Sequence, residues 1–156
     1  MAGTDVIWRA IRKNSFAVVS YVTPSGEPRS SGVVYAEHDR RLYVAVSSNS
    51  WKARHIRISG QVAVTVTVRR GGLLSLLTPI PPATVSFHGT ATVHAATSPE
   101  GNEALTYVAR LLPPRSRAAG SIVEIRPEGH FVTYGIGVAL LAMRDPAASR
   151  GRVSVT

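Results

Sequence analysis

The sequence predicts a mainly β (α+β) protein, built as a small antiparallel β-barrel of six to seven strands with short peripheral helices. Short runs of β-branched and aromatic residues recur at close spacing, separated by turns that contain glycine or proline. The alternation of strands with long helices that builds a doubly wound sheet is missing. A length of 156 residues favours one domain. We expect an N-terminal helix within residues 1–15, the barrel over residues 16–134 and a tail over residues 135–156.

The first part of the chain predicts one helix followed by a three-stranded meander. Thr4–Asn14 has the apolar spacing of an amphipathic helix, and Thr4 is placed to cap it. Turn-forming residues at 24–28 and 37–40 then separate β-rich segments that pair as two hairpins. The three expected strands are Phe16–Thr23, Arg29–Ala36 and Arg41–Ser47.

The middle of the chain predicts a short helix, a strand and an apolar loop. Ser50 can cap a helix that ends near Ile58. Gln61–Val68 alternates valine with alanine and threonine, which is typical of a strand with one apolar face. Arg69–Pro82 is a loop with an apolar centre, Leu73–Leu77. Because a monomer would leave this centre exposed, we expect a dimer partner to cover it.

The last third predicts a long strand, a helix and a hairpin. Ala83–Ala95 is rich in β-formers and contains Gly89, where a bend is expected. Ser98 followed by Pro99 is typical of a helix start, and two prolines at 113–114 end that helix. We expect a final hairpin with its turn at residues 127–129 and a polar end to the tail. Its two strands are Ser121–Arg126 and His130–Tyr134.

The positive charge of the chain gives only weak information about the kind of partner that it binds. The formal net charge is +9, and only Lys13 and Lys52 are lysines. A coding bias toward arginine, an anionic small ligand or a nucleic acid each explains such an excess. The arginines are scattered, and no basic run is interleaved with aromatic residues. Nucleic-acid binding is therefore the least supported of the three.

Several other residue types exclude classes of chemistry. The absence of cysteine excludes disulfides, thiolate metal sites and cysteine nucleophiles. The five histidines do not form a ligand set, and the carboxylates form no catalytic pair, so we assign no metal site and no catalytic residue. No apolar stretch approaches the ~20 residues that span a bilayer. The N-terminal residues lack the layout of a signal peptide, and we expect a cytoplasmic protein without a membrane partner.

The segment Ser47–Ile56 carries the clearest functional pattern. A β-branched run, Leu42–Val46, leads into a turn of serines and one asparagine, and Ser50 then caps a helix that bears Lys52 and Arg54. Hydroxyl groups, a helix N-terminus and cations together form a site for a phosphate. The pattern therefore indicates a phosphorylated cofactor, a flavin or a flavin analogue.

Each of these residues also has an ordinary structural interpretation. Lys52 and Arg54 are compatible with solvated helix cations, and Arg57 is an alternative to Arg54 for a longer ligand. Trp51 is compatible with an aromatic residue that closes the helix onto the barrel. The serines of the turn are compatible with plain turn and cap chemistry.

The order of these segments resembles the pyridoxamine 5′-phosphate oxidase-like, FMN-binding split β-barrel superfamily, which includes flavin and deazaflavin oxidoreductases. The resemblance is strongest over residues 16–68, and residues 83–96 and 121–134 fit it more loosely. It implies a homodimer with two cofactor sites at the subunit interface. It also implies that the cofactor phosphate lies by residues 47–54 and that the ring lies along residues 31–35. The cofactor-binding residues implied in this way are Ser31, Val33, Val34, Tyr35, Ser47, Ser50, Trp51, Lys52 and Arg54.

The chain matches the family pattern at one key position and departs from it at two others. Lys52 corresponds to the phosphate-binding lysine. Trp51 stands where pyridoxamine-phosphate oxidases proper commonly carry an arginine, and residues 30–32 offer no match for their arginine on the second strand. These departures argue against the pyridoxamine-phosphate reaction.

The resemblance implies an oxidoreductase that transfers hydride to or from a small organic substrate. FMN and the deazaflavin coenzyme F420 both remain alternatives for its cofactor, and the high arginine content suits the anionic tail of the deazaflavin. A second hypothesis is a non-catalytic carrier or sensor that binds a flavin or haem. A third is a basic β-barrel that binds nucleic acid, for which the scattered arginines give little support.

Overall fold

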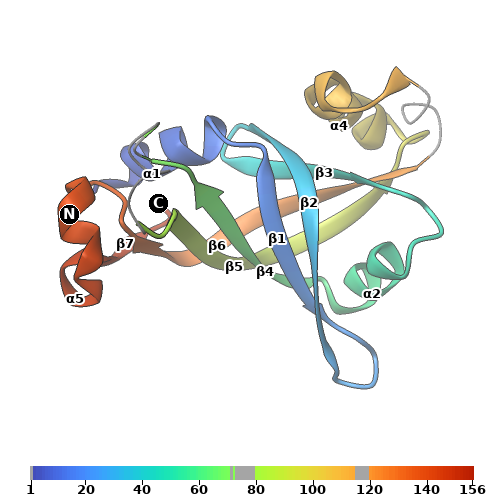
Figure 1. Ribbon diagram of the computed structural model, residues 1–156. Coiled ribbons are helices and arrows are strands. Elements are labelled where there is room, and N and C mark those ends of the chain that lie inside the picture. Colours follow the sequence, from blue (N-terminus) through green and yellow to red (C-terminus); the bar gives the residue numbers. More distant parts are fainter. Residues whose placement is uncertain (1, 71, 73–79, 115–119) are drawn as a thin grey trace.

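The computed structural model describes residues 2–70, 72, 80–114 and 120–156, and it shows seven strands with short helices at their periphery (Figure 1). The strands are β1 (Phe16–Val22), β2 (Pro28–His38), β3 (Arg41–Val46), β4 (Gln61–Val68), β5 (Ala83–Ala95), β6 (Ser121–Tyr134) and β7 (Arg150–Ser154). The helices are α1 (Thr4–Arg12), α2 (Trp51–Ser59), α4 (Pro99–Val108) and α5 (Pro146–Ser149), with 3₁₀ turns η1 (Ala109–Leu111) and η3 (Leu140–Arg144).

The strands form a six-stranded antiparallel barrel with one extra strand, which confirms the predicted fold class. Their order is β3-β2-β1-β4-β5-β6-β7, and β3 also pairs with β6 to close the barrel. β7 pairs with the second half of β6, outside the closed part. Among the described residues, no helix has the length and apolar character needed to cross a membrane.

The barrel is split beside β2. Residues 28–34 of β2 pair with β1, whereas only residues 35–38 pair with β3. The end of β3 pairs with β6 and not with β2. An opening therefore separates the first half of β2 from the end of β3, and α2 lies across it with Ala53 and Ile56 buried.

Two apolar clusters hold the barrel and its helices together. The alternating valines of β4 (62, 64 and 66) point into the barrel, as the period-2 pattern predicts. The buried face of α1 covers one end, where the Trp8 and Phe131 rings meet edge to face at 5.3 Å. A smaller cluster beneath α4 consists of Ala36, Tyr43, Ala104, Val108 and Ile122.

The structure corrects two expectations at the ends of the chain. Gly3, not Thr4, is the N-cap of α1, because the Thr4 hydroxyl donates to the carbonyl oxygen of Ser154 instead. The tail was expected to have an apolar stretch and a polar end, without an assigned helix or strand, yet it contains α5 and the strand β7. Asp145 caps α5 by accepting a hydrogen bond from the Ala147 amide.

The expected final hairpin is wrong, because β6 runs without a turn from Ser121 to Tyr134. The residues read as a turn form an irregularity in the ladder: Ser86 pairs with Val132, but His88 already pairs with Glu128. Gly129 adopts a φ of 68° and absorbs the extra residues as a bulge. Because β5 continues past the irregularity on both sides, the strand does not reverse. The expected apolar centre of the loop, Leu73–Leu77, lies outside the described residues.

Gly89 allows the closest approach of the two long strands, which generates the first prediction. A Cβ atom there would overlap the carbonyl oxygen of Arg126, so Gly89→Ala must push β5 and β6 apart. We expect a loss of about 2–3 kcal/mol in the free energy of unfolding, measured by urea denaturation. At Gly3 an added Cβ meets nothing within 4 Å, so Gly3→Ala should cost no more than a helix cap, about 1 kcal/mol. Equal stabilities of the two variants would contradict this prediction.

Candidate functional site

The serine turn before α2 is ordered by its own hydrogen bonds. The Ser50 side chain accepts a hydrogen bond of 3.1 Å from the Ala53 amide, which confirms the predicted cap. The Ser50 amide in turn donates to the Ser47 carbonyl at 3.0 Å. The helix N-terminus, with its remaining free amides, is therefore held at the opening of the barrel.

Helix α2 presents two different faces to its surroundings. Lys52 and Ile56, four residues apart, lie on the face that covers the barrel opening. Trp51 and His55 lie on another face and approach the β1–β2 hairpin, where the rings of His55 and Tyr21 are 5.8 Å apart. The Arg54 guanidinium lies 5.4 Å from the centre of the Trp51 ring. Arg54 is thus exposed and stacked on Trp51, away from Lys52.

Lys52 is a partly buried cation in apolar surroundings. Its side chain lines a small space with Val33, Val46 and other apolar residues of the barrel. Burial lowers the pKa of Lys52 below its ordinary value, since the charged ammonium loses hydration. No carboxylate among the described residues forms an ion pair with it. A bound anion would supply the missing counter-charge.

The predicted residues of β2 divide between the two faces of the strand. Val33 is buried and lines the same space as Lys52, and Ser31 lies two residues away on that face. The Ser31 hydroxyl oxygen is buried without a hydrogen-bond partner in the described structure. Val34 points to the outer face and is 48% exposed. Tyr35 is fully buried, and its hydroxyl donates to the Ile11 carbonyl at 2.6 Å.

The structure therefore brings some of the predicted residues together and separates others. The serine turn, Lys52 and Val33 meet at the barrel opening. The side chains of Val34 and Tyr35 point away from this group, and burial raises the pKa of Tyr35, whose hydroxyl is already used. Val34 can therefore contribute to a site through its backbone or its exposed side chain, and Tyr35 only through its backbone.

The opening also exposes backbone hydrogen-bonding groups that sequence reasoning did not resolve. The Tyr35 amide donates to the Ser15 carbonyl, so odd-numbered residues of β2 direct their peptide groups to β1. Ser30 and Gly32 then direct theirs toward the split, where no strand of the described structure pairs with them. This edge runs from the hairpin toward α2 and offers both donors and acceptors.

A larger cavity of about 590 Å³ lies between the β1–β2 hairpin and α2. It is lined by Tyr21, Thr23, Pro24, Ser25, Glu27, Arg29, Trp51 and His55. Trp51 was predicted as a site residue, whereas the others were not. Their separation in sequence explains this, since only the fold of the hairpin brings them opposite α2.

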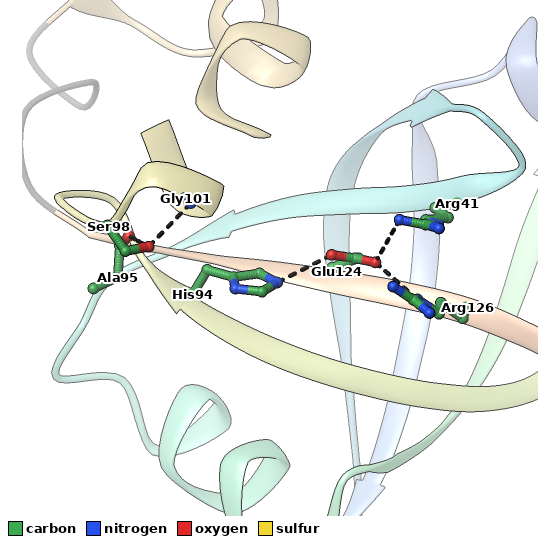
Figure 2. Close-up of polar contacts among 7 residues, drawn as sticks. All are labelled: Arg41, His94, Ala95, Ser98, Gly101, Glu124 and Arg126. Carbon is green, nitrogen blue, oxygen red and sulfur yellow. Dashed lines mark hydrogen bonds and ion pairs between the residues drawn. The ribbon is translucent and has the colours of Figure 1, made fainter. Parts of the chain in front are cut away.

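A second polar group, beneath α4, is centred on one carboxylate (Figure 2). Glu124 accepts hydrogen bonds from Arg126 at 2.9 Å, His94 at 3.0 Å and Arg41 at 3.2 Å. Burial alone would raise the pKa of Glu124, but the hydrogen bonds from Arg126 and His94 hold it below its ordinary value. This carboxylate is thus ionised and saturated, and unsuited to act as a base. Within the described ranges, no group of three or more histidine, aspartate or glutamate residues is placed to hold a metal.

Comparison with protein-family models found a match along most of the chain. The family model of pyridoxamine 5′-phosphate oxidase matches residues 4–132. Comparison with curated protein sequences gave no significant match.

Three solved structures illustrate the range of similar proteins. HutZ, the heme storage protein from Vibrio cholerae, is 14% identical with a TM-score of 0.69, covering 88% of this chain and 98% of its own. A heme binding protein from Mycobacterium smegmatis is 14% identical with a TM-score of 0.72, covering 99% of this chain and 59% of its own. An F420 reductase is 19% identical with a TM-score of 0.57, covering 79% of this chain and 93% of its own. At these identities the likeness shows the fold alone.

The burial of Lys52 generates a prediction for the ligand-free protein. Lys52→Met should raise the free energy of unfolding at neutral pH, because it removes a charge that burial disfavours. Between the lowered pKa and the ordinary value of 10.5, the unfolded chain binds more protons than the folded chain. The wild-type protein therefore gains stability as pH rises through this window, and the advantage of the variant should shrink.

Urea unfolding at neutral and alkaline pH measures this advantage. Lys13→Met is the matched control, since Lys13 is the other lysine and is exposed. Its stability should change little at either pH. A Lys52→Met protein less stable than the wild type at neutral pH would show that the ammonium is well accommodated without an anion.

Proposed function

The chain belongs to the pyridoxamine 5′-phosphate oxidase family, and from this premise we propose that it is an oxidoreductase with a phosphorylated flavin-type cofactor. The cofactor is FMN or coenzyme F420, bound at the interface of a homodimer, and the substrate is a small organic molecule. The observation that carries the proposal is Lys52, a partly buried cation beside a helix N-terminus without a counter-ion among the described residues. A phosphate at this place would pair with the ammonium and complement the helix dipole.

The residues around Lys52 fit such a group in three ways. The Ser31 hydroxyl, buried and unpartnered, is free to bond a polar atom of a ligand. The hydroxyl groups of Ser47 and Ser50 flank the helix start, and Ser50 keeps its own hydrogen as a donor while it caps α2. The open edge of β2 offers peptide groups for the polar rim of a planar ring. When bound, the cofactor supplies the hydride chemistry, while the protein binds and orients it.

The pyridoxamine-phosphate reaction is not part of this proposal. Trp51 is 70% exposed and carries no charge at the position next to Lys52, and Ser31 is short and neutral. One lysine with hydroxyl groups suffices to bind a single phosphate of a cofactor. A second phosphate, on a substrate, would need a further cation, and the nearby Arg54 and Arg29 are stacked on Trp51 and paired with Glu27.

A haem-binding role, as carrier or sensor, is the second candidate function. It is favoured by His55, which lines the cavity beside α2. Histidine is a common axial ligand of haem iron. Haemin titration distinguishes this candidate, because a shifted haem absorption band that disappears in His55→Ala would replace the flavin proposal.

The homodimer is proposed on the outer face of the sheet formed by β2, β1, β4 and β5. Where the four strands pair, most outward side chains are small or apolar, and none is an arginine, a lysine or a carboxylate. They include Ser30, Gly32, Val34, Phe16, Val18, Ser20, Ala63, Thr65, Thr67, Thr84 and Ser86, and the larger polar exceptions are Gln61 and His88 at one end of β4 and β5. Phe16 and Val34 pair across the strands and are each 48% exposed. In a chain of net charge +9, an uncharged sheet face is typical of a surface covered by a partner.

Cofactor binding depends on Lys52 in this proposal. FMN and F420 should each be titrated against the protein, with cofactor fluorescence as the readout, and at least one should bind. Lys52→Ala removes a charge-assisted hydrogen bond of about 1.5–3 kcal/mol, so the affinity should fall roughly ten- to hundredfold. Lys13→Ala removes an exposed lysine of the same charge and should leave the affinity unchanged. Binding of neither cofactor to the wild-type protein would refute the proposal.

The homodimer is tested by placing a charge on the outer face. Phe16→Asp should convert the dimer to monomer in sedimentation equilibrium, because an aspartate would be desolvated at the interface. Ile58→Asp is the control, since Ile58 is 69% exposed on α2 and away from this face. A wild-type protein that sediments as a monomer, or a Phe16→Asp protein that stays dimeric, would place the interface elsewhere.

A further inference from the structure

The cavity between the β1–β2 hairpin and α2 has the size of a small-molecule site. Its volume of about 590 Å³ falls within the range of roughly 300–1,000 Å³ that is usual for ligand pockets. It adjoins the proposed phosphate site, because Trp51 precedes Lys52 and Arg29 lies two residues from Ser31 on the same face of β2. None of its lining residues other than Trp51 takes part in the proposed phosphate site.

One side of this cavity is a row of three aromatic rings. Trp51 and His55 lie on one face of α2 with ring centres 5.9 Å apart, and Tyr21 of β1 continues the row at 5.8 Å from His55. Trp51 is 70% exposed, although tryptophan has the largest side chain of all residue types and is usually well buried. An exposed tryptophan beside further rings favours a ligand that stacks.

The other side of the cavity is polar and fixed in shape. The hairpin turn is closed by hydrogen bonds from the Thr23 amide to the Glu27 carbonyl and from the Gly26 amide to the Thr23 carbonyl, both 2.9 Å long. The hydroxyl groups of Thr23 and Ser25 bond each other at 2.9 Å. A preformed wall of this kind lowers the cost of ordering on binding.

The charges that line the cavity cancel, which favours an uncharged ligand. Arg29 donates to Glu27 at 2.7 Å, so the one cation and the one carboxylate of the lining neutralise each other. The hydroxyl groups of Thr23 and Ser25 remain as hydrogen-bonding groups that line the cavity. These groups suit a polar edge on an uncharged molecule.

We propose that this cavity binds an uncharged, planar aromatic molecule, stacked on Trp51 and His55, with a hydrogen-bonding edge toward the hairpin. Its role as the substrate subsite of the oxidoreductase rests on the proposed function, whereas its binding of an aromatic molecule does not. The substrate class is thus a neutral aromatic or heteroaromatic compound, in contrast to the phosphorylated amine that gives the family its name.

The protein carries a natural reporter for this test, because it has only two tryptophans, and Trp8 is 3% exposed. The variant Trp8→Phe leaves Trp51 as the only source of indole fluorescence. The probe is 2-quinolinone, a neutral bicyclic lactam with one donor and one acceptor on its edge. Saturable quenching of Trp51 fluorescence is expected, and its saturated analogue decahydroquinolin-2-one should not compete.

Calorimetric titration of three further proteins separates this site from the phosphate site. Trp51→Leu should bind 2-quinolinone at least about tenfold more weakly, since stacking is lost. Wild-type protein and Lys52→Met should bind it equally, with or without inorganic phosphate. Equal binding by Trp51→Leu, competition by the saturated analogue, or no saturable quenching would overturn the inference.

The two proposals fail independently in these experiments. If FMN and F420 do not bind but 2-quinolinone does, the cavity stands and the proposed function falls. If a cofactor binds in a Lys52-dependent manner and 2-quinolinone does not bind, the proposed function stands and the aromatic subsite falls.

Discussion

The incomplete pairing of β2 is the constraint on which the rest of the structure depends. A barrel of six strands closes only if every strand finds two neighbours, and β2 finds its second neighbour over residues 35–38 alone. Helix α2 follows β3 along the chain (Figure 1) and lies at the remaining gap, where its residue Ile56 packs into the core. The partial burial of Lys52, the open peptide groups of β2 and the cavity beneath the hairpin all result from this gap. The proposed site thus lies where the pairing of the sheet is interrupted.

The charges of Glu124 and Lys52 are treated in opposite ways by their surroundings. Glu124 is surrounded by two arginines and a histidine, so its charge is satisfied by the protein itself (Figure 2). Lys52 has a desolvated charge without such partners among the described residues. A charge that the protein itself pairs contributes to the local structure, whereas an unpaired charge at a surface opening favours binding of a counter-ion. The contrast makes the opening, rather than the groove beneath α4, the place where an anion is expected.

Local patterns predicted the elements well, but not the contacts between distant ones. The Ser50 and Ser98 caps and five of the seven strands follow from period-2 alternation and from turn residues. The proline and glycine at 127 and 129 favoured a turn, and only the continuous neighbour β5 turned that segment into a bulge. The strand β7 has few β-formers and depends on β6 for its pairing. The serine turn and Lys52 were found from sequence, while the unpartnered Ser31 hydroxyl and the hairpin cavity exist only in the folded register.

The pairing of β3 with β6 also determines the order in which the chain can assemble. Leu42 pairs with Ile125, and Thr4 reaches Ser154, so the barrel joins segments that are far apart in sequence. During synthesis the meander of β1 to β3 emerges early. The edge of β3 then stays unpaired until β6 has been made. A high contact order of this kind is typical of slow folding. Nascent chains of this protein are therefore expected to depend on protection of that edge, by chaperones or by slow translation, until the second half of the barrel arrives.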